Sequence, residues 1–436
     1  MSSFHPPQTT PRTTRRQFVQ RSSTVLAGAS LLGGLSVARR AHAAGDDTIR
    51  VGLIGCGGRG TGAASQALRA DANVKLVAMA DAFRDNLEDK LQVLSRDNDI
   101  RDKIDVPKER QFAGFDAYQQ CIDSGVDLVI LATPPGFRPI HLAAAIAADK
   151  HVFMEKPVAV DGPGIRSVLE SVAQAKEKKL GIGVGLQRHH QTPYLETVKR
   201  LQDGEIGDIV SARAYWNGAG VWVRPRKDDQ TEMEYQMRNW YYFNWLCGDH
   251  IVEQHIHNLD VINWVKDAYP VRCQGMGGRE VRRGENHGEI YDHHAVEYEY
   301  ADGSRMFSFC RHIPNCWNSV TEHVQGTKGR ADISGSRIET ADGSRWRYRG
   351  DNPNPYQVEH DDLFASIRSG NPLNEGEYGA YSTLTSIMGR MATYSGKMVT
   401  WEQALSSELD LSPTKYAWDA EPPKPTVAVP GVTLAV

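Results

Sequence analysis

Short apolar runs alternate with amphipathic segments through the first part of the chain, a pattern typical of an open α/β sheet. Apolar runs predict strands at Ile49–Ile54, Val74–Ala80, Val126–Ala132 and His151–Met154, and a separate strand-like run follows later at Leu180–Leu186. Ala-rich helical patterns follow at Thr61–Arg69 and His141–Ala148. Continuous apolar runs such as 126–132 are typical of strands buried on both faces of a parallel sheet. The sequence therefore predicts an α/β fold whose doubly wound parallel sheet extends to about residue 157, within a first domain over residues 48–175.

The later part of the chain predicts a second α/β domain over residues 176–404, with a largely antiparallel open sheet. Strands are expected at Ile209–Trp216, Val271–Met276, Ala295–Tyr300 and Arg305–Cys310. Helices around 357–369 and 379–395 are expected to pack back near the first domain. A further helix is predicted at Cys247–Val261, because apolar positions there follow a helical period. Residues 405–436 contain several prolines and predict an extended tail.

The composition is that of a globular protein and excludes several classes. The chain has 436 residues, of which 40% are apolar and 24% are charged, which fits two domains. The formal net charge of −4 excludes a nucleic-acid binder with a strongly basic surface. No apolar run reaches the ~18–20 residues that a membrane span needs. The six cysteines include no CxxC pair, so no zinc ribbon is indicated and no metal is expected.

Residues 1–43 have the features of an export leader. Residues 14–19 (TRRQFV) match the twin-arginine pattern, a weakly apolar stretch follows at 24–37, and Ala41-His42-Ala43 offers a small-x-small cleavage site. The alternative is an arginine-rich leader in which two arginines are adjacent by chance. We expect the protein to be exported already folded by the twin-arginine route, to the periplasm or another extracytoplasmic space. Residues 1–43 are therefore left out of the fold.

A glycine-rich turn joins the first predicted strand to the first helix. It is a GxGxxG sequence made of Gly55, Cys56, Gly57, Gly58, Arg59 and Gly60. In this position the glycines permit a tight turn, a close approach of backbone to a pyrophosphate, and close packing of helix on strand. The diphosphate would lie at the positive helix N-terminus. The sequence therefore predicts a dinucleotide site.

The second predicted strand ends at Asp81, where a carboxylate would accept hydrogen bonds from the adenosine ribose hydroxyls. Because a carboxylate repels a 2′-phosphate, NAD is expected rather than NADP. Arg84 lies nearby and leaves three alternatives open: it stacks on adenine, helps to admit NADP, or lies in solvent. Thr133 and Pro134 follow the 126–132 strand at the carboxyl edge of the sheet, where open α/β sheets bind ligands.

The tripeptide Glu155-Lys156-Pro157 at the end of the 151–154 strand makes a resemblance specific. Together with GxGxxG, the acid at Asp81 and the Thr-Pro turn, it resembles the glucose–fructose oxidoreductase/inositol dehydrogenase (Gfo/Idh/MocA) family. The resemblance extends from Thr48 to about Ala404, and the leader makes the chain similar to the exported members. It implies that Glu155 and Lys156 lie at the cofactor, that Lys156 reaches the nicotinamide and the reacting hydroxyl, and that a cis bond often precedes Pro157.

Glu253 and His257 are four residues apart, and on a continuous helix they would share one face. The family usually carries Asp-x-x-x-His-x-x-Asp here, with the histidine as proton acceptor and the first acid assisting it. This chain matches His257 and Asp260 but has Glu253 in place of the usual Asp. An imidazole suits proton transfer because its ordinary pKa is ~6.5. A core histidine, or a metal site shared by His250, Glu253 and His257, are the alternatives.

Four further residues are candidates for substrate contacts, and Gln187 is a candidate for the cofactor. In the family the turn that corresponds to residues 185–190 lies beside the nicotinamide and the substrate, which indicates Gln187 and Arg188; a surface loop is the alternative. His255 replaces a small residue usual in the family and is expected to narrow the cleft or to contact substrate. Trp240 and His360 are expected to line a sugar pocket, with core packing as the alternative.

These features predict an NAD-dependent oxidoreductase that moves a hydride between bound nicotinamide and the hydroxyl carbon of a sugar, polyol or sugar derivative. A redox-neutral hydrolase, lyase or epimerase that works through a ketosugar is the alternative enzyme. A non-catalytic sugar- or nucleotide-binding sensor is the alternative from another class. We expect a homo-oligomer, as is common in the family. Because export would separate the protein from a free nicotinamide pool, we expect the cofactor to be retained and recycled in place.

Overall fold

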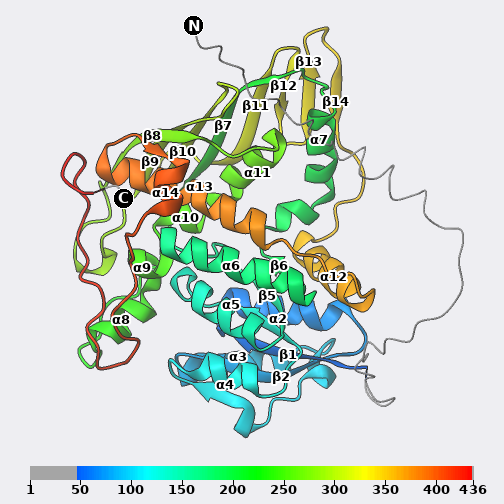
Figure 1. Cartoon of the computed structure of the whole chain (residues 1–436), viewed down its shortest axis with the longest axis vertical. Helices are drawn as coiled ribbons and strands as arrows, with labels where there is room; N and C mark the ends of the chain where they lie inside the picture. The colour runs from blue at the N-terminus through cyan, green and yellow to red at the C-terminus, as the bar shows by residue number, and fades with distance from the viewer. Residues whose placement is uncertain (1–46, 435–436) are drawn as a thin grey trace, which may run out of the picture. The chain divides into compact units, whose positions relative to one another are not determined.

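The computed structural model describes residues 47–434; the expected leader therefore lies outside the described residues. The first sheet, in the lower half of Figure 1, is parallel and has the order β3-β2-β1-β4-β5-β6. Its strands are β1 (Ile49–Ile54), β2 (Val74–Asp81), β3 (Gln111–Ala113), β4 (Leu128–Leu131), β5 (His151–Met154) and β6 (Ile182–Val184). The strand order reverses between β1 and β4, which makes the carboxyl edge there a ligand-binding position. The predicted doubly wound parallel sheet is confirmed.

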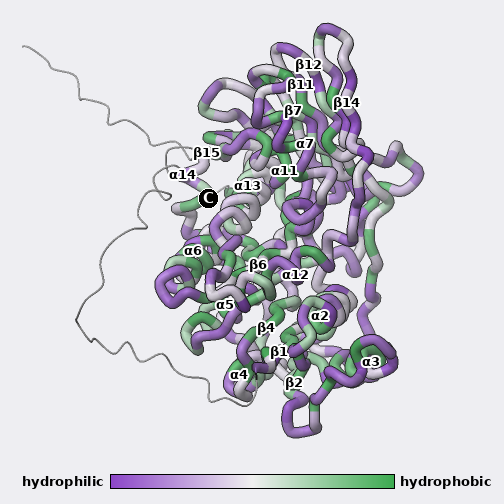
Figure 2. Tube along the Cα trace, turned by 90° about the vertical axis from the view of Figure 1, so that its right-hand side faces the viewer, coloured by the Kyte–Doolittle hydropathy of each residue, from purple (hydrophilic) through white to green (hydrophobic). Residues whose placement is uncertain are grey.

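Helices cover this sheet because its strands are apolar on both faces. Leu53 on β1 and Val129 on β4 have no exposed surface, and the tube along β4 is hydrophobic in Figure 2. The helices of this part are α2 (Gly58–Ala70), α3 (Arg84–Ser95), α4 (Ala117–Asp123), α5 (Arg138–Ala147) and α6 (Gly162–Lys178). Strand β6 pairs with β5 and lies after residue 175, so the first sheet continues past the domain boundary that the sequence suggested.

The second sheet has the order β14-β13-β12-β11-β7-β10-β9-β8-β15 among the described residues. In this sheet β7 and β10 pair in parallel, and the other neighbouring strands within residues 47–434 pair antiparallel, as expected. Its strands are β7 (Ile209–Gly218), β8 (Arg272–Gly278), β9 (His293–Glu299), β10 (Arg305–His312), β11 (Ser319–Gly326), β12 (Gly329–Asp332), β13 (Arg337–Thr340), β14 (Arg345–Arg347) and β15 (Val399–Thr400). The prediction did not include β11 to β14.

Two late helices connect the sheets. α12 (Pro355–Arg368) packs on α2, where Gln357 Nε2 donates to the Gln66 carbonyl at 3.0 Å. α13 (Gly376–Ser395) is buried along most of its length and contacts both α6 and β8. The expectation that these helices pack back on the first domain is therefore confirmed. The second part also contains α7 (Thr192–Gln202), α8 (Glu232–Arg238) and α14 (Trp401–Ser406). No helix within residues 47–434 is long and apolar enough to cross a bilayer.

The single helix predicted at Cys247–Val261 is wrong. The chain forms α9 (Asn244–Cys247), α10 (His250–Glu253) and α11 (Ile256–Lys266) instead. The first break occurs at Gly248 and Asp249, which have φ of 75° and 74°. The Asp249 side chain accepts a hydrogen bond from the His250 N–H at 2.5 Å and so caps the next helix. The spacing of the apolar residues carries no information about such a cap, so the sequence pattern did not predict the break in the helix.

Candidate active site

A cavity of about 390 Å³ lies at the carboxyl edge of β1, β2 and β4. Its size is in the usual range for small-molecule sites. Most of the residues expected to bind the cofactor line it, namely Gly55, Gly57, Gly58, Arg59, Asp81, Thr133 and Pro134. The topological switch point and the glycine-rich turn therefore meet at one cavity.

The glycines of the turn have three different structural roles. Gly55 has φ +100°, and an added Cβ would lie 2.5 Å from the Ala132 carbonyl carbon; at Gly60 it would lie 2.0 Å from the Gly55 oxygen. These two positions therefore require glycine for the fold itself. A Cβ at Gly57 or Gly58 would meet nothing within 4 Å, so the backbone there is open to the cavity. Since α2 begins at Gly58, its N-terminal N–H groups suit a dinucleotide diphosphate.

Asp81 ties the end of β2 to the glycine-rich turn. Its carboxylate accepts hydrogen bonds from the Cys56 N–H at 2.7 Å and the Phe83 N–H at 2.8 Å. Burial raises the pKa of Asp81, and these bonds oppose the rise. Cys56 is buried and directs its N–H to Asp81, so it supports the turn without lining the cavity.

Arg84 does not line the cavity, which corrects its expected place among the cofactor residues. Its guanidinium donates to the Gln111 carbonyl at 2.9 Å, and the residue is exposed. Because this bond holds the side chain at the neighbouring strand β3, the structure fits the alternative of a solvated helix residue.

Glu155 and Gln187 are joined to the cavity through Arg59. The Arg59 Nε lies 2.8 Å from Glu155 Oε1 in an ion pair, and its guanidinium lies 4.7 Å from the Tyr356 ring centroid. Gln187 Nε2 donates to the Tyr356 hydroxyl at 3.2 Å. Neither Glu155 nor Gln187 is itself part of the cavity lining. The network therefore positions Arg59 at the cavity edge.

Lys156 connects the end of β5 in the first sheet to Glu253 on α10. It follows β5, its bond to Pro157 is cis, and its Nζ donates to the Glu253 carbonyl at 2.6 Å and to Glu253 Oε1 at 3.2 Å. Both side chains are largely buried, with 12% and 13% of their surface exposed. An ammonium group has three N–H donors, so with two bound to Glu253 one is left for a ligand oxygen.

His257 lies beside this pair in its neutral form, which leaves a ring nitrogen free of a proton. Burial lowers its pKa well below the usual range, and the positive charges of Lys156 and Arg188 lower it further. Its Nδ1 is buried and has no hydrogen-bond partner among residues 47–434. The ring stacks near Trp216 at a centroid distance of 5.9 Å. A neutral imidazole at neutral pH is therefore held next to a positive charge.

Arg188 is a positioning residue in this structure. Its guanidinium donates to the His257 carbonyl at 2.9 Å and pairs with the buried carboxylate of Glu322. Asp260, the other family-like acid, lies on α11 and accepts from Ser382 Oγ at 2.7 Å. Both contacts fix α11, and thereby the backbone that carries His257.

Two of the substrate candidates are core residues, which corrects those expectations. His255 has no exposed surface, and its ring nitrogens bond Asn258 Oδ1 at 3.3 Å and Ser308 Oγ at 2.8 Å. His360 is also fully buried and packs on Phe153 at a centroid distance of 4.1 Å. Trp240 lines the cavity at the glycine-rich turn, so it lies at the expected cofactor site.

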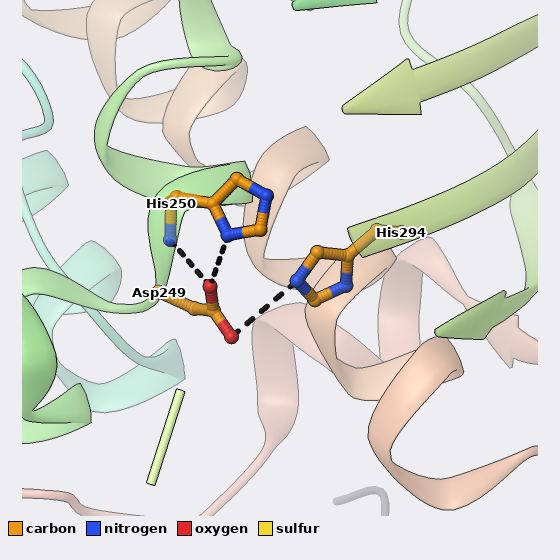
Figure 3. Close-up of side chains that lie close together, drawn as sticks. All are labelled: Asp249, His250 and His294. Carbon is orange, nitrogen blue, oxygen red and sulfur yellow. Dashed lines mark hydrogen bonds and ion pairs between the residues drawn. The ribbon is translucent and has the colours of Figure 1, made fainter. Parts of the chain in front are cut away.

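A buried cluster joins Asp249 and His250, at the start of α10, to His294 on β9 (Figure 3). These residues form the one group of possible metal ligands found in the described part of the chain, with ligand atoms within 4.8 Å of one another. Asp249 already accepts bonds from the Tyr394 hydroxyl and the Tyr291 N–H, and Arg282 Nη1 lies 3.3 Å from His250 Nδ1. The arginine charge opposes a bound cation, so we interpret the cluster as a hydrogen-bond network that fixes the start of α10.

The metal alternative built on His250, Glu253 and His257 is not supported by this geometry. His250 directs Nδ1 to Asp249 Oδ1 at 2.8 Å, whereas Glu253 is directed at Lys156. The break before α11 separates Glu253 from His257, so the face that a continuous helix would give them does not form.

Sequence reasoning missed two groups of residues near the site. Trp222, Arg224 and Met237 line the cavity from the second part of the chain. Glu359 on α12 is buried, and its pKa is raised well above the usual range by burial and by the charge of Glu155. Residues 216–245 are rich in tryptophan and tyrosine, which is a sequence signal for the first group, whereas no local pattern marks Glu359.

The fold and the site define a dinucleotide-binding oxidoreductase of two α/β parts. Residues 49–186 match the family described as "Oxidoreductase family, NAD-binding Rossmann fold", and residues 194–332 match the GFO/IDH/MocA C-terminal domain. The chain belongs to the Gfo/Idh/MocA oxidoreductase family.

Known proteins with similar sequences include two inositol 2-dehydrogenases. The one from Rhizobium meliloti (strain 1021) is 24% identical over 302 residues, covering 68% of this chain and 80% of the relative. The one from Gluconacetobacter diazotrophicus is 23% identical over 348 residues, covering 77% and 90%.

Solved structures agree on the fold. The aldose-aldose oxidoreductase from Caulobacter crescentus has a TM-score of 0.63 at 18% identity and covers 81% of this chain and 99% of its own. A levoglucosan dehydrogenase in complex with NADH and levoglucosan has a TM-score of 0.63 at 16% identity, with 82% and 100% covered.

Proposed function

We propose that this protein is an NAD-dependent oxidoreductase that acts on a hydroxyl carbon of a sugar, a polyol or a sugar derivative. The observation that carries the proposal is the contact of Lys156 with Glu253 beside the buried His257, at the carboxyl edge of the dinucleotide-binding sheet. The names of the relatives, inositol 2-dehydrogenases, an aldose-aldose oxidoreductase and a levoglucosan dehydrogenase, support cyclic polyols and aldoses as the substrate class.

The side chains divide the chemistry between them. His257 accepts the proton of the substrate hydroxyl on a ring nitrogen, which its depressed pKa leaves unprotonated. Lys156 donates its remaining N–H to the oxygen as negative charge develops, where a positioned charge stabilises most. Glu253 holds Lys156 and lowers the cost of keeping its charge in a largely buried place. Bound NAD supplies the acceptor for the hydride.

NAD is preferred over NADP in this proposal. Asp81 lines the cavity and would repel a ribose 2′-phosphate, and the exposed Arg84, which could have neutralised it, is held at β3. The comparison of Kd values for NADH and NADPH tests this preference. Tighter binding of NADH is expected, and tighter binding of NADPH would contradict it.

The function is tested by incubating the purified protein with NAD and a panel of inositols, aldoses and anhydrosugars, followed by product analysis. A ketone formed together with NADH supports the proposal. A cleaved or epimerised sugar with no net NADH identifies the redox-neutral alternative instead. Ligand recovered unchanged in every case, despite binding, contradicts catalysis and favours the sensor. The variant His257→Asn is the control. It removes the proton acceptor, so product should form far more slowly than in the wild type.

Two further features belong to the same proposal. We propose export by the twin-arginine route, for which the support is the sequence of residues 1–43, and consequent retention of the cofactor. We also propose a homo-oligomer that uses the outer face of the second sheet, because Phe307, Phe309 and Met276 expose 36%, 38% and 76% of their surface on one face there. A monomer in light scattering would contradict the second.

A further inference from the structure

The wall of the cofactor cavity is built partly from segments far from the glycine-rich turn. Phe83, Phe115 and Phe137 line the cavity from the segments that follow β2, β3 and β4. Trp222, Arg224, Met237 and Trp240 line it from residues 221–240, which we call the roof. Within the roof, Trp222 and Trp240 contact each other edge-on at a centroid distance of 5.8 Å. A dinucleotide that uses the Asp81 end of the cavity therefore lies beneath residues of the second part of the chain.

The C-terminal tail covers the same aromatic wall. Residues 411–420, which we call the strap, place Trp418 at centroid distances of 5.1 Å from Phe83 and 4.6 Å from Phe115. Tyr416 lies 5.5 Å from Phe137. The strap has no helix or strand of its own, and Figure 1 shows the red C-terminal segment running past α8. The tail that the sequence predicts to be merely extended is thus packed onto the cavity wall.

Both ends of this arrangement are fixed by polar contacts. The Leu411 N–H donates to the buried Asp161 carboxylate at 2.9 Å, which anchors the start of the strap. Arg238, at the end of α8, bonds the Asp85 carboxylate at 2.8 and 3.1 Å and lies 3.7 Å from the Phe83 ring centroid. Phe83 is therefore in contact with both Arg238 from the roof and Trp418 from the strap.

We propose that Arg238, Tyr416 and Trp418 form a clamp that closes the adenine end of the cofactor cavity and makes the dinucleotide slow to exchange. This inference rests on the proposed NAD-binding function. For the dinucleotide to leave, the roof must separate from Phe83 and the strap must lift from the wall. The clamp acts on the rate of exchange, since its members contact the wall and are not themselves part of the cavity lining.

The test uses the full chain loaded with unlabelled NAD and mixed with an excess of isotopically labelled NAD, and exchange is followed by mass spectrometry. The double variant Tyr416→Ala/Trp418→Ala is expected to exchange about tenfold faster, because aromatic pairs stabilise beyond their buried area and a tenfold change is about 1.4 kcal/mol. Asp85→Asn removes an exposed partner of Arg238 without touching the aromatic wall, and a smaller acceleration is expected. Lys415→Ala, at an exposed position of the same strap, is the matched control and should exchange like the wild type.

The outcomes separate the clamp from the function on which it rests. Exchange in the double variant and in Asp85→Asn as slow as in the wild type overturns the clamp. Faster exchange with a thermal unfolding midpoint equal to that of Lys415→Ala supports it. If the double variant unfolds at a lower temperature, Asp85→Asn decides between the two results: faster exchange supports the clamp, and exchange as slow as in the wild type overturns it. A wild-type protein that takes up no NAD contradicts the proposed function itself, and the clamp with it.

Discussion

Lys156 is the residue on which the chemistry depends most directly. Replacing it by Met removes the donor to the developing alkoxide and leaves Glu253 without its cation. Loss of one positioned donor typically lowers kcat by about 10²–10³-fold. We expect this loss for Lys156→Met, with binding of NADH unchanged, because Lys156 is not part of the cavity lining.

The measurement for this prediction is kcat together with the Kd for NADH. Lys75→Met is the matched control, since Lys75 is exposed on β2 and should retain both values. Turnover that survives in Lys156→Met would mean that the lysine has only a structural role at the junction of the two halves.

Individual residues were predictable where their chemistry is tied to a motif. The cavity-lining glycines, Asp81, Thr133 and Pro134 follow the pattern of the strand–turn–helix unit, and the structure brings them together. The places of His255 and His360 were not predictable, because a histidine in the core and one in a cleft have the same local sequence signal. Only the tertiary partner, Ser308 Oγ for His255, distinguishes the two.

At the scale of elements, two glycines of the β1–α2 turn have different roles, one in folding and the other in cofactor binding. Gly60→Ala would place a methyl group 2.0 Å from the Gly55 oxygen, whereas Gly57→Ala would meet nothing within 4 Å. We expect Gly60→Ala to lower the free energy of unfolding by about 1–3 kcal/mol, the usual cost of overpacking. Gly57→Ala should fold normally and bind NADH more weakly, because its methyl group enters the space left for the diphosphate.

Chemical denaturation and NADH titration of both variants check this pair. Gly57 has φ −82°, so alanine fits the backbone and the two glycines serve as controls for each other. Unchanged NADH affinity in Gly57→Ala would contradict the assignment of the cavity to the dinucleotide.

The cap of α10 is a second element with a testable role. Asp249 is fully buried, has φ 74°, and accepts bonds from Tyr394 and from the N–H groups of Tyr291 and His250. Asp249→Asn removes a buried charge that these donors are arranged to bind, and we expect a loss of about 3 kcal/mol. Catalysis should fall as well, because α10 carries Glu253.

Asp267→Asn is the matched control for this prediction. Asp267 also has a positive φ, of 47°, but is exposed at the end of α11. An exposed substitution of this kind usually changes stability by about 0.5 kcal/mol or less. Equal urea midpoints for the two variants would contradict the role of the buried network.

The accuracy of the element predictions follows from how each element is stabilised. β1 and β5 were predicted with their observed bounds, because strands buried on both faces need continuous apolar runs. β12, β13 and β14 were missed, since they are short, lie towards one edge of the sheet and carry exposed arginines such as Arg337 and Arg345. The interrupted helix at α10 depends on side-chain capping, which apolar periodicity does not contain.

For the whole molecule, buried histidines predict sensitivity to acid. Burial lowers the pKa of His141, His255 and His360 to about 3 and that of His250 to about 4. As pH falls through ~6.5, the unfolded chain binds protons that the folded chain does not, so the free energy of unfolding decreases. The effect is on the order of 2 kcal/mol per histidine at about pH 5. Burial raises the pKa of Glu289 to about 7, so the folded chain binds a proton there before the unfolded chain does. This protonation stabilises the fold as pH falls and offsets part of the decrease.

Urea denaturation at about pH 7.5 and about pH 5 measures this dependence. We expect a clearly lower midpoint at the acid pH. A midpoint that is equal or higher there would show that these histidines are not held neutral in the folded protein.

The most direct test of the account is a single-turnover reduction of bound cofactor. Protein loaded with NAD is mixed with an excess of each inositol or aldose, and the near-ultraviolet absorbance of NADH is followed with time. The account predicts that at least one compound converts the bound NAD to NADH in the wild type, and that His257→Asn, with the same amount of NAD bound, does so far more slowly. Bound NAD that stays oxidised with every sugar and polyol that binds, or equal rates in His257→Asn, would contradict it.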